Sequence, residues 1–264
     1  MLLEFLDQRP LWAVFACMVC ILFGGAEIGF YFGKWQRRRS QVEEKSLDVI
    51  LGAALGLLAF MLAFSFGMAG STNGLRKAVV LEEANAIGTA YLRAQLLPEP
   101  HGSEIQNLLR EFVDVRIEAP RFQNMGEVKE LVARSDELHE ELWSRSIALS
   151  KENSGSIFAG LFFSDSLNDV IDLHSKRKAA ALHNRIPRSI YTSLAFLAVM
   201  TMTLMGYRSG LTGIRTLIPR FALILAFGAI MLLITELDRP FRTKLLINQQ
   251  VMIDLQETMS KTKE

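Results

Sequence analysis

The stretch Leu55–Arg93, "LGLLAFMLAFSFGMAGSTNGLRKAVVLEEANAIGTAYLR", decides the fold of this chain. It begins as an uninterrupted apolar segment, ends as a polar segment with two adjacent glutamates, and contains no proline. Residues 75–97 have high helix propensity, so the stretch predicts one helix that crosses a membrane and continues in water, with a kink near Gly70 and Gly74. The chain is therefore expected to join a membrane part to a helical extramembrane part.

Composition supports a membrane protein. Half of the 264 residues are hydrophobic, and the excess lies in four windows, which are residues 11–33, 49–70, 189–207 and 216–235. Each window is close to the ~20 residues that cross ~30 Å of hydrocarbon as a helix. We predict four transmembrane helices in an all-α, multi-pass protein. A signal peptide is the alternative for the first window, but its lead-in is not basic and its apolar core exceeds the usual ~7–15 residues.

The windows form two pairs that flank a long polar centre. We predict a first transmembrane pair at 11–70, a helical, stalk-like extramembrane domain at 71–186, a second pair at 187–236 and an amphipathic C-terminal tail at 237–264. The centre is helical because its apolar residues recur every three or four positions. Examples are Ile105, Leu108, Leu109, Phe112 and Val113, then Val128, Leu131, Leu138 and Leu142.

Membrane orientation stays open at the level of sequence. Five basic residues lie in the first short linker, at positions 34 to 45, and the positive-inside rule then favours a cytoplasmic linker and an external domain. The run "KRK" at 176–178, with Arg185 and Arg188, opposes this assignment. The net formal charge of +1 implies no nucleic-acid partner.

The second span carries a stripe of small residues at helical spacing, with Gly52, Gly56, Ala63 and Gly67 as its main members. Small residues let helices approach closely, so the stripe indicates helix packing within the subunit or between copies. Phe60 and Phe64 stand beside the stripe on adjacent turns. They face lipid or core, or they form a hydrophobic constriction of the kind that gates pores by dewetting.

A second face of interest follows on the same predicted helix. Its members are spaced i, i+3, i+7 and i+11, and they are Glu82, Asn85, Thr89 and Arg93. The face is a solvated surface or buried polar seam, or it lines a vestibule continuous with a pore. A similar polar face before the third span contains Asp165, Asn168, Asp169 and Asp172. We expect the two helices to pair, with Arg93 facing one of these aspartates.

Glu27 is an acid inside the first predicted span. Such a residue costs a few kcal/mol unless it is paired or hydrated, so it is a functional-site candidate, and pairing with an interfacial arginine is the structural alternative. Cys17 and Cys20 have C-x-x-C spacing within the same span, but no other cysteine is present to complete a metal set, so we interpret them as small apolar residues.

Motifs for enzymes are missing from the sequence, which has no G-x-S-x-G, H-E-x-x-H, P-loop or G-x-G-x-x-G pattern. The four histidines, at 101, 139, 174 and 183, are scattered with no partner spacing and are interpreted as surface or packing residues. We therefore expect no enzymatic activity, no cofactor and no metal site.

Several motifs resemble the bacterial membrane proteins called bestrophin-like. They are "EIGFYFGKWQRRR" (27–39), "EEANAIGTAYLR" (82–93), "LLREFVDVRIE" (108–118) and "SLNDVIDLHSKRKAAALHNRIP" (166–187). The resemblance implies comparison with bestrophins, pentameric anion channels whose second membrane helices line a pore with a hydrophobic neck and extend into a cytosolic vestibule. It implies that Phe60 and Phe64 match the neck and that Asn85 and Thr89 match the vestibule lining. It also implies a bacterial inner (cytoplasmic) membrane location.

The leading hypothesis is an oligomeric ion channel that conducts small inorganic anions and is formed by copies of this chain in a lipid bilayer. A desolvating neck at Phe60 and Phe64 would control conduction, although Phe66 faces away from both rings by about 120° or more on a helix. The alternative hypothesis is a non-conducting scaffold or sensor whose helical extramembrane domain binds a partner protein.

Overall fold

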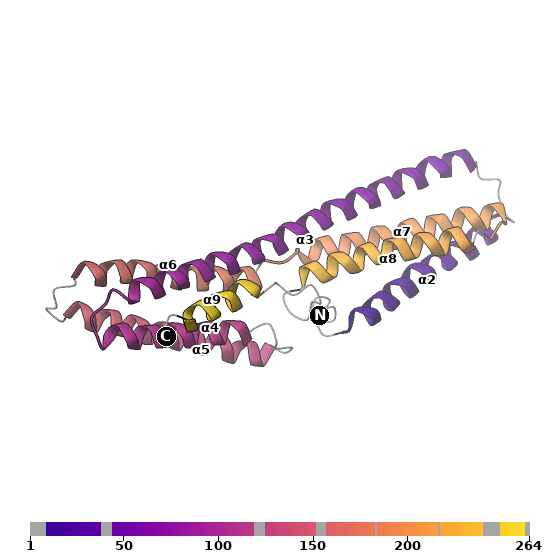
Figure 1. The fold of residues 1–264 in the computed structure, drawn as a ribbon. Coiled ribbons are helices and arrows are strands. Elements are labelled where there is room, and N and C mark those ends of the chain that lie inside the picture. The colour runs from indigo at the N-terminus through magenta and orange to yellow at the C-terminus, as the bar shows by residue number, and fades with distance from the viewer. Residues whose placement is uncertain are drawn as a thin grey trace. The chain divides into compact units, whose positions relative to one another are not determined.

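The computed structural model describes residues 9–37, 44–118, 125–151, 157–182, 184–215, 217–239 and 249–261. Within these ranges the chain is all-helical and contains no strand, which confirms the predicted fold class (Figure 1). The helices are α2 (Leu11–Arg37), α3 (Glu44–Ala94), α4 (His101–Glu118), α5 (Met125–Lys151), α6 (Ile157–Leu182), α7 (Arg188–Thr212), α8 (Leu217–Asp238) and α9 (Gln250–Lys261).

Four of these helices are long and apolar enough to cross a membrane. They are α2, the residues of α3 from Ser46, α7 and α8, so the four predicted spans are confirmed. The predicted continuity of Leu55–Arg93 is also confirmed, because α3 is one helix that continues through Gly70 and Gly74 to Ala94. The kink near these glycines stays a prediction.

The chain divides into two compact units. One comprises the described residues up to Thr72 together with Arg185–Arg239, and it holds the apolar spans. The other comprises Asn73–Asn184 together with the described part of Pro240–Glu264. Helix α3 contributes to both units, since its apolar half belongs to the first and its polar half to the second.

Close approach of backbones holds α2 against α7 in the first unit. A Cβ added to Gly29 would lie 2.8 Å from the Thr203 carbonyl carbon, and one added to Gly206 would lie 2.8 Å from the Ala26 carbonyl carbon. Gly33 and Gly210 are equally crowded by the facing backbone. Association of helices in a bilayer relies on this close packing, because lipid tails are as apolar as the side chains.

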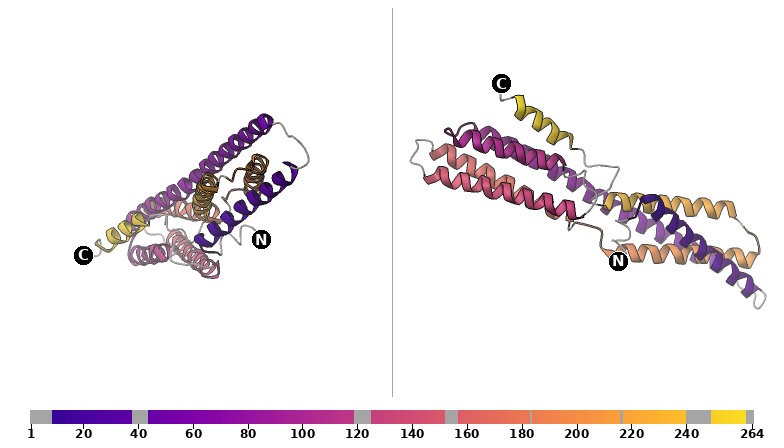
Figure 2. Two further views of the ribbon diagram at one scale, coloured as in Figure 1. Left: turned by 90° about the vertical axis from the view of Figure 1, so that its right-hand side faces the viewer. Right: turned by 90° about the horizontal axis from the view of Figure 1, so that it is seen from below.

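The second unit is a soluble-type helical bundle with its own core. Ile105, Leu109, Phe112 and Val113 of α4 and Leu138 and Leu142 of α5 are fully buried, which confirms the predicted apolar faces; the side chain of Val128 lies outside what the structure describes. Helix α9 adds Met252 and Met259 to the same core. The Tyr91 hydroxyl donates a hydrogen bond to the Met259 carbonyl at 3.2 Å, which fastens α9 to α3. Helix α9 is the yellow ribbon near the C-terminus in Figure 2.

Candidate functional site

The apolar half of α3 presents one packed face and one open face. Leu58, Leu62, Ser65 and Ala69 are buried in the first unit. The small-residue stripe lies on the opposite side, and no described atom comes within 4 Å of a Cβ built on Gly52, Gly56 or Gly67. Ala63 is exposed as well. The glycines of the stripe therefore have room for a closer neighbour than any described residue of the subunit provides.

The phenylalanines predicted for the neck are on the open side of α3. Phe60 is 66% exposed and Phe64 is 52% exposed, so neither ring belongs to the core of the subunit. Phe66 is also exposed. At about 100° per residue, Phe60 and Phe64 flank one edge of the stripe and Phe66 flanks the other. In a membrane these three rings would face lipid, a second copy of the chain or the lumen of a pore.

Two members of the predicted polar face are paired with α6. Lys176 Nζ lies 2.6 Å from Glu82 Oε2, and Arg93 Nη1 lies 3.1 Å from Asp165 Oδ2. The expected pairing of Arg93 with an aspartate of the second polar face is confirmed. Glu82, Asn85 and Thr89 are exposed, whereas Arg93 is partly buried.

Glu27 is paired inside the first unit. Its carboxylate lies 3.1 Å from Arg220 Nη1 and 3.4 Å from Arg215 Nη2, which confirms the pairing alternative. Arg220 is fully buried, and the Arg215 guanidinium carbon lies 4.5 Å from the centre of the Phe30 ring. Glu27 is partly buried, with a side chain that is 22% exposed, and its pairing with two arginines stabilises the local packing of α2 against α8.

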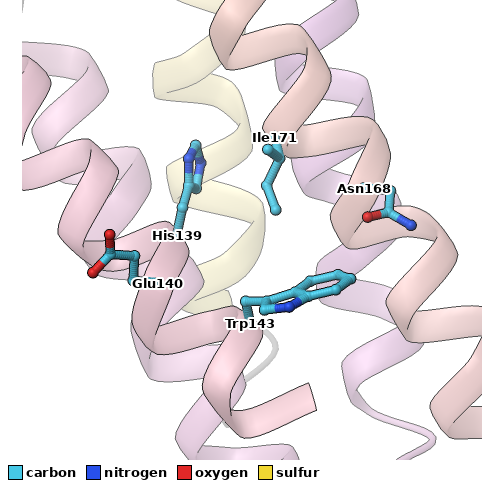
Figure 3. A pocket seen from close by; sticks show the side chains of 5 residues that line it. All are labelled: His139, Glu140, Trp143, Asn168 and Ile171. Atoms are coloured by element: carbon cyan, nitrogen blue, oxygen red, sulfur yellow. The ribbon is translucent and has the colours of Figure 1, made fainter. Parts of the chain in front are cut away.

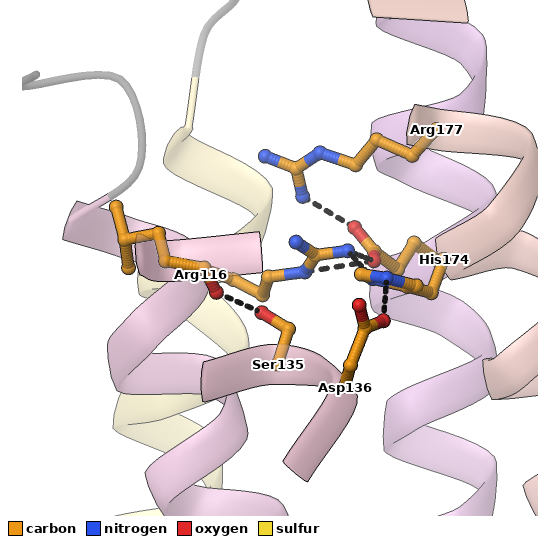
Figure 4. A network of polar contacts seen from close by, with 7 residues as sticks. Arg116, Ser135, Asp136, His174 and Arg177 are labelled. Carbon is orange, nitrogen blue, oxygen red and sulfur yellow. Dashed lines mark hydrogen bonds and ion pairs between the residues drawn. The ribbon is translucent and has the colours of Figure 1, made fainter. Parts of the chain in front are cut away.

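A buried polar network in the second unit joins four helices, and sequence reasoning missed it. Glu83 of α3 accepts a hydrogen bond from Arg116 Nε of α4 at 2.9 Å and pairs with Arg177 of α6 (Figure 4). Arg116 Nη2 also lies 2.6 Å from His174 Nδ1, and His174 Nε2 lies 2.9 Å from Asp136 Oδ1 of α5.

The family assignment rests on most of the chain. The family model for the Bestrophin-like domain matches residues 11–252. The chain belongs to the Bestrophin-like family. Its fold is similar to two solved structures at a TM-score of 0.60 and 13% sequence identity. One is a point variant of a bacterial bestrophin homologue from Klebsiella pneumoniae, covering 96% of this chain and 100% of that chain. The other is a point variant of a membrane protein, covering 93% and 95%. No curated protein matches the sequence.

Burial sets the protonation states in the polar network of this Bestrophin-like chain. Burial lowers the pKa of both His139 and His174 to about 4. The nearby Arg116 charge acts in the same direction on each imidazole, and His174 adds to the effect on His139. Both imidazoles are therefore neutral at pH 7. Since a guanidinium only donates, His174 Nδ1 accepts from Arg116 and its Nε2–H donates to Asp136.

His139 and His174 were predicted to be surface or packing residues, and both are buried, with their ring centres 4.8 Å apart. Their sequence spacing did not indicate that they would lie side by side. His139 also borders a pocket of about 370 Å³ between α5 and α6 (Figure 3). The other residues that line it are Glu140, Trp143, Asn168 and Ile171. His183 lies outside the described residues. Cys17 and Cys20 are exposed thiols on the apolar helix α2.

Proposed function

We propose that this Bestrophin-like chain forms an oligomeric anion channel in a lipid bilayer, with its pore lined by the open face of α3. The observation that carries the proposal is the division of this helix into a packed face and an open face, on which the phenylalanines are exposed and no described residue packs closely on the glycines. The resemblance to bestrophins also supports α3 as the pore-lining helix, because the second membrane helices line the pore in bestrophins.

The two kinds of residue on the open face suit two different contacts. Glycine and alanine allow a neighbouring copy to approach closely, so the stripe is proposed as the contact between copies. Phe60 and Phe64 are displaced from the centre of the stripe by about 60° and 100° on a helix. In a ring formed by one α3 helix from each copy, the stripe would then face the neighbouring helix, and the two phenylalanines would point toward the central axis.

A ring of phenylalanines controls conduction by dehydrating the permeating ion. A narrow apolar constriction dewets, so an anion passes only if it sheds part of its water at a tolerable cost. Weakly hydrated anions are favoured over strongly hydrated ones by this mechanism. The exposed Asn85 and Thr89 lie further along the same continuous helix and offer uncharged polar groups to an ion. No cofactor enters the mechanism.

Halide flux from liposomes that contain the purified chain tests the proposal. Phe60→Ala removes the ring from the neck and is expected to raise flux several-fold above the wild type. Phe196→Ala is the matched control, because Phe196 is an equally exposed phenylalanine of a span, at 66%, but belongs to α7. Its flux is expected to equal that of the wild type.

Equal effects of Phe60→Ala and Phe196→Ala would contradict a neck on α3. Absence of flux from the wild type and from Phe60→Ala, in a folded oligomer with defined size, would refute channel function. It would favour the non-conducting scaffold or sensor, whose helical unit binds a partner protein.

A further inference from the structure

Three potential metal ligands meet in the second unit. Asp136 and His139 are three residues apart on α5 and share one face of that helix, and His174 faces them from α6. One possible ligand atom from each residue lies within 4.8 Å of the other two. We propose that Asp136, His139 and His174 bind a divalent transition metal ion, for which Zn²⁺ is the natural probe.

The donor set selects the class of metal. Two imidazole nitrogens and one carboxylate oxygen suit Zn²⁺ and its neighbours Co²⁺ and Ni²⁺, whereas Ca²⁺ and Mg²⁺ prefer oxygen ligands alone. An acid and a histidine at i and i+3 on one helix, joined by a ligand from a facing helix, also form the metal sites of many helical bundles. Three protein ligands leave a fourth tetrahedral position for water.

The distances require only a small rearrangement. His174 Nε2 and Asp136 Oδ1 are already 2.9 Å apart. Ligand atoms at about 2.1 Å from a tetrahedral ion lie roughly 3.4 Å from one another, so the His139 side chain must close by about 1 Å. Asp136 is free to adjust, because its side chain is 49% exposed.

His139 gives independent support for a ligand at this point. The residue is only 7% exposed, and its Nε2 atom is buried with no hydrogen-bond partner among the described residues. A buried nitrogen without a hydrogen-bond partner destabilises the fold, and a bond to a metal ion would remove that cost. The neighbouring pocket, with His139 in its wall, provides a route from solvent and room for a water ligand (Figure 3).

Nearby cations limit the affinity. Lys178 Nζ lies 3.5 Å from Asp136 Oδ2, and Arg116 Nη2 lies 2.6 Å from His174 Nδ1. When the metal takes the place of the Nε2 proton of His174, that proton moves to Nδ1, and Arg116 then keeps only its bonds to Glu83. Because both cations repel the incoming ion, we expect micromolar affinity, well short of that of a structural zinc site.

Isothermal titration of Zn²⁺ into the full chain, purified in detergent without a polyhistidine tag, tests the site. We expect one ion per wild-type chain. His139→Gln and Asp136→Asn are each expected to weaken binding by at least ~10-fold, the lower end of what even an outer-shell change costs. His101→Gln is the matched control, since His101 is also buried but lies on α4, and it is expected to bind like the wild type.

Two further readouts separate a lost site from a lost fold. Helicity and elution volume of each variant must match the wild type, and Asp136→Asn serves where His139→Gln does not fold. Co²⁺ bound to the wild type should show the intense visible bands of tetrahedral coordination, absent from both ligand variants. Zn²⁺ affinity unchanged in folded Asp136→Asn, or an octahedral Co²⁺ spectrum in the wild type, would overturn the proposal.

Discussion

The contact between α2 and α7 makes the substitution Gly206→Ala a sharp test of the packing in the first unit. The added Cβ would overlap the Ala26 carbonyl oxygen and would lie 2.8 Å and 3.0 Å from the carbonyl carbon and Cα of the same residue. Ordinary contacts of a Cβ begin at about 3.4 Å. The obstacle is backbone, which cannot rotate away, so the two helices must separate by roughly 1 Å.

The cost follows from that separation. Overpacking a well-packed core costs about 1–3 kcal/mol, and a backbone obstacle places this site at the upper end. Alanine regains about 1 kcal/mol of helix propensity over glycine. We therefore expect a net loss of about 2 kcal/mol in the free energy of unfolding. That loss lowers the ratio of folded to unfolded protein by roughly 30-fold.

Unfolding in mixed micelles by titration with a denaturing detergent measures this loss, with helicity as the readout. Gly24→Ala on α2 is the matched control, because nothing in the described chain lies within 4 Å of its added Cβ. This control is expected to leave the subunit unchanged or to stabilise it by up to ~1 kcal/mol. If Gly206→Ala is as stable as Gly24→Ala, the close approach of α2 and α7 is refuted.

Three further outcomes follow from the structure. Gly56→Trp should dissociate the oligomer in cross-linking and size-exclusion experiments without lowering the helicity of the subunit, if α3 forms the contact between copies. Glu83→Gln should destabilise the chain by about 3–5 kcal/mol in chemical denaturation, because it leaves two guanidinium groups without a buried counter-charge. Glu82→Gln, whose side chain is half-exposed, should cost less than ~1 kcal/mol. With a chelator present, the free energy of unfolding should fall as the pH drops from 6.5 to about 4, by about 3 kcal/mol for each imidazole of His139 and His174. The reason is that the folded state keeps both imidazoles neutral, whereas the unfolded state protonates them in this range.

The helices and the spans could be predicted because their signals are local. Apolar length identifies a span by itself, and the absence of proline from Leu55–Arg93 was enough to predict that α3 leaves the membrane as one helix. The pairing of Arg93 with an aspartate was also within reach, since both polar faces show helical spacing. The spans depend on residues within a few turns of one another, and the pairing depends on two such local faces, one on α3 and one on α6.

The buried network could not be predicted in the same way, because its members come from four helices. One signal was present in the doublet at 82 and 83. Only Glu82 fits the spacing of the polar face, whereas Glu83 shares a helix face with buried Val79 and Ile87, at i−4 and i+4. An acid on an apolar face requires a buried cation as its partner. The sequence does not identify that cation as Arg116, and it does not place His174 beside it.

Exposure of the open face of α3 does not by itself indicate a contact with another protein, because a phenylalanine or leucine that faces lipid has no free-energy cost. The glycines are what distinguish it. Each glycine in a helix costs about 0.5–1 kcal/mol relative to alanine. On α2 and α7 that cost is offset by backbone approach that no larger residue permits, as at Gly29 and Gly206. Gly52, Gly56 and Gly67 carry the same cost without a contact from any described residue of the subunit. Contact with lipid does not offset this cost either, since an alanine or leucine would face the lipid tails equally well. We propose that contact with a second copy of the chain offsets it, so the small residues of α3 are a reason to expect an oligomer before any pore is considered.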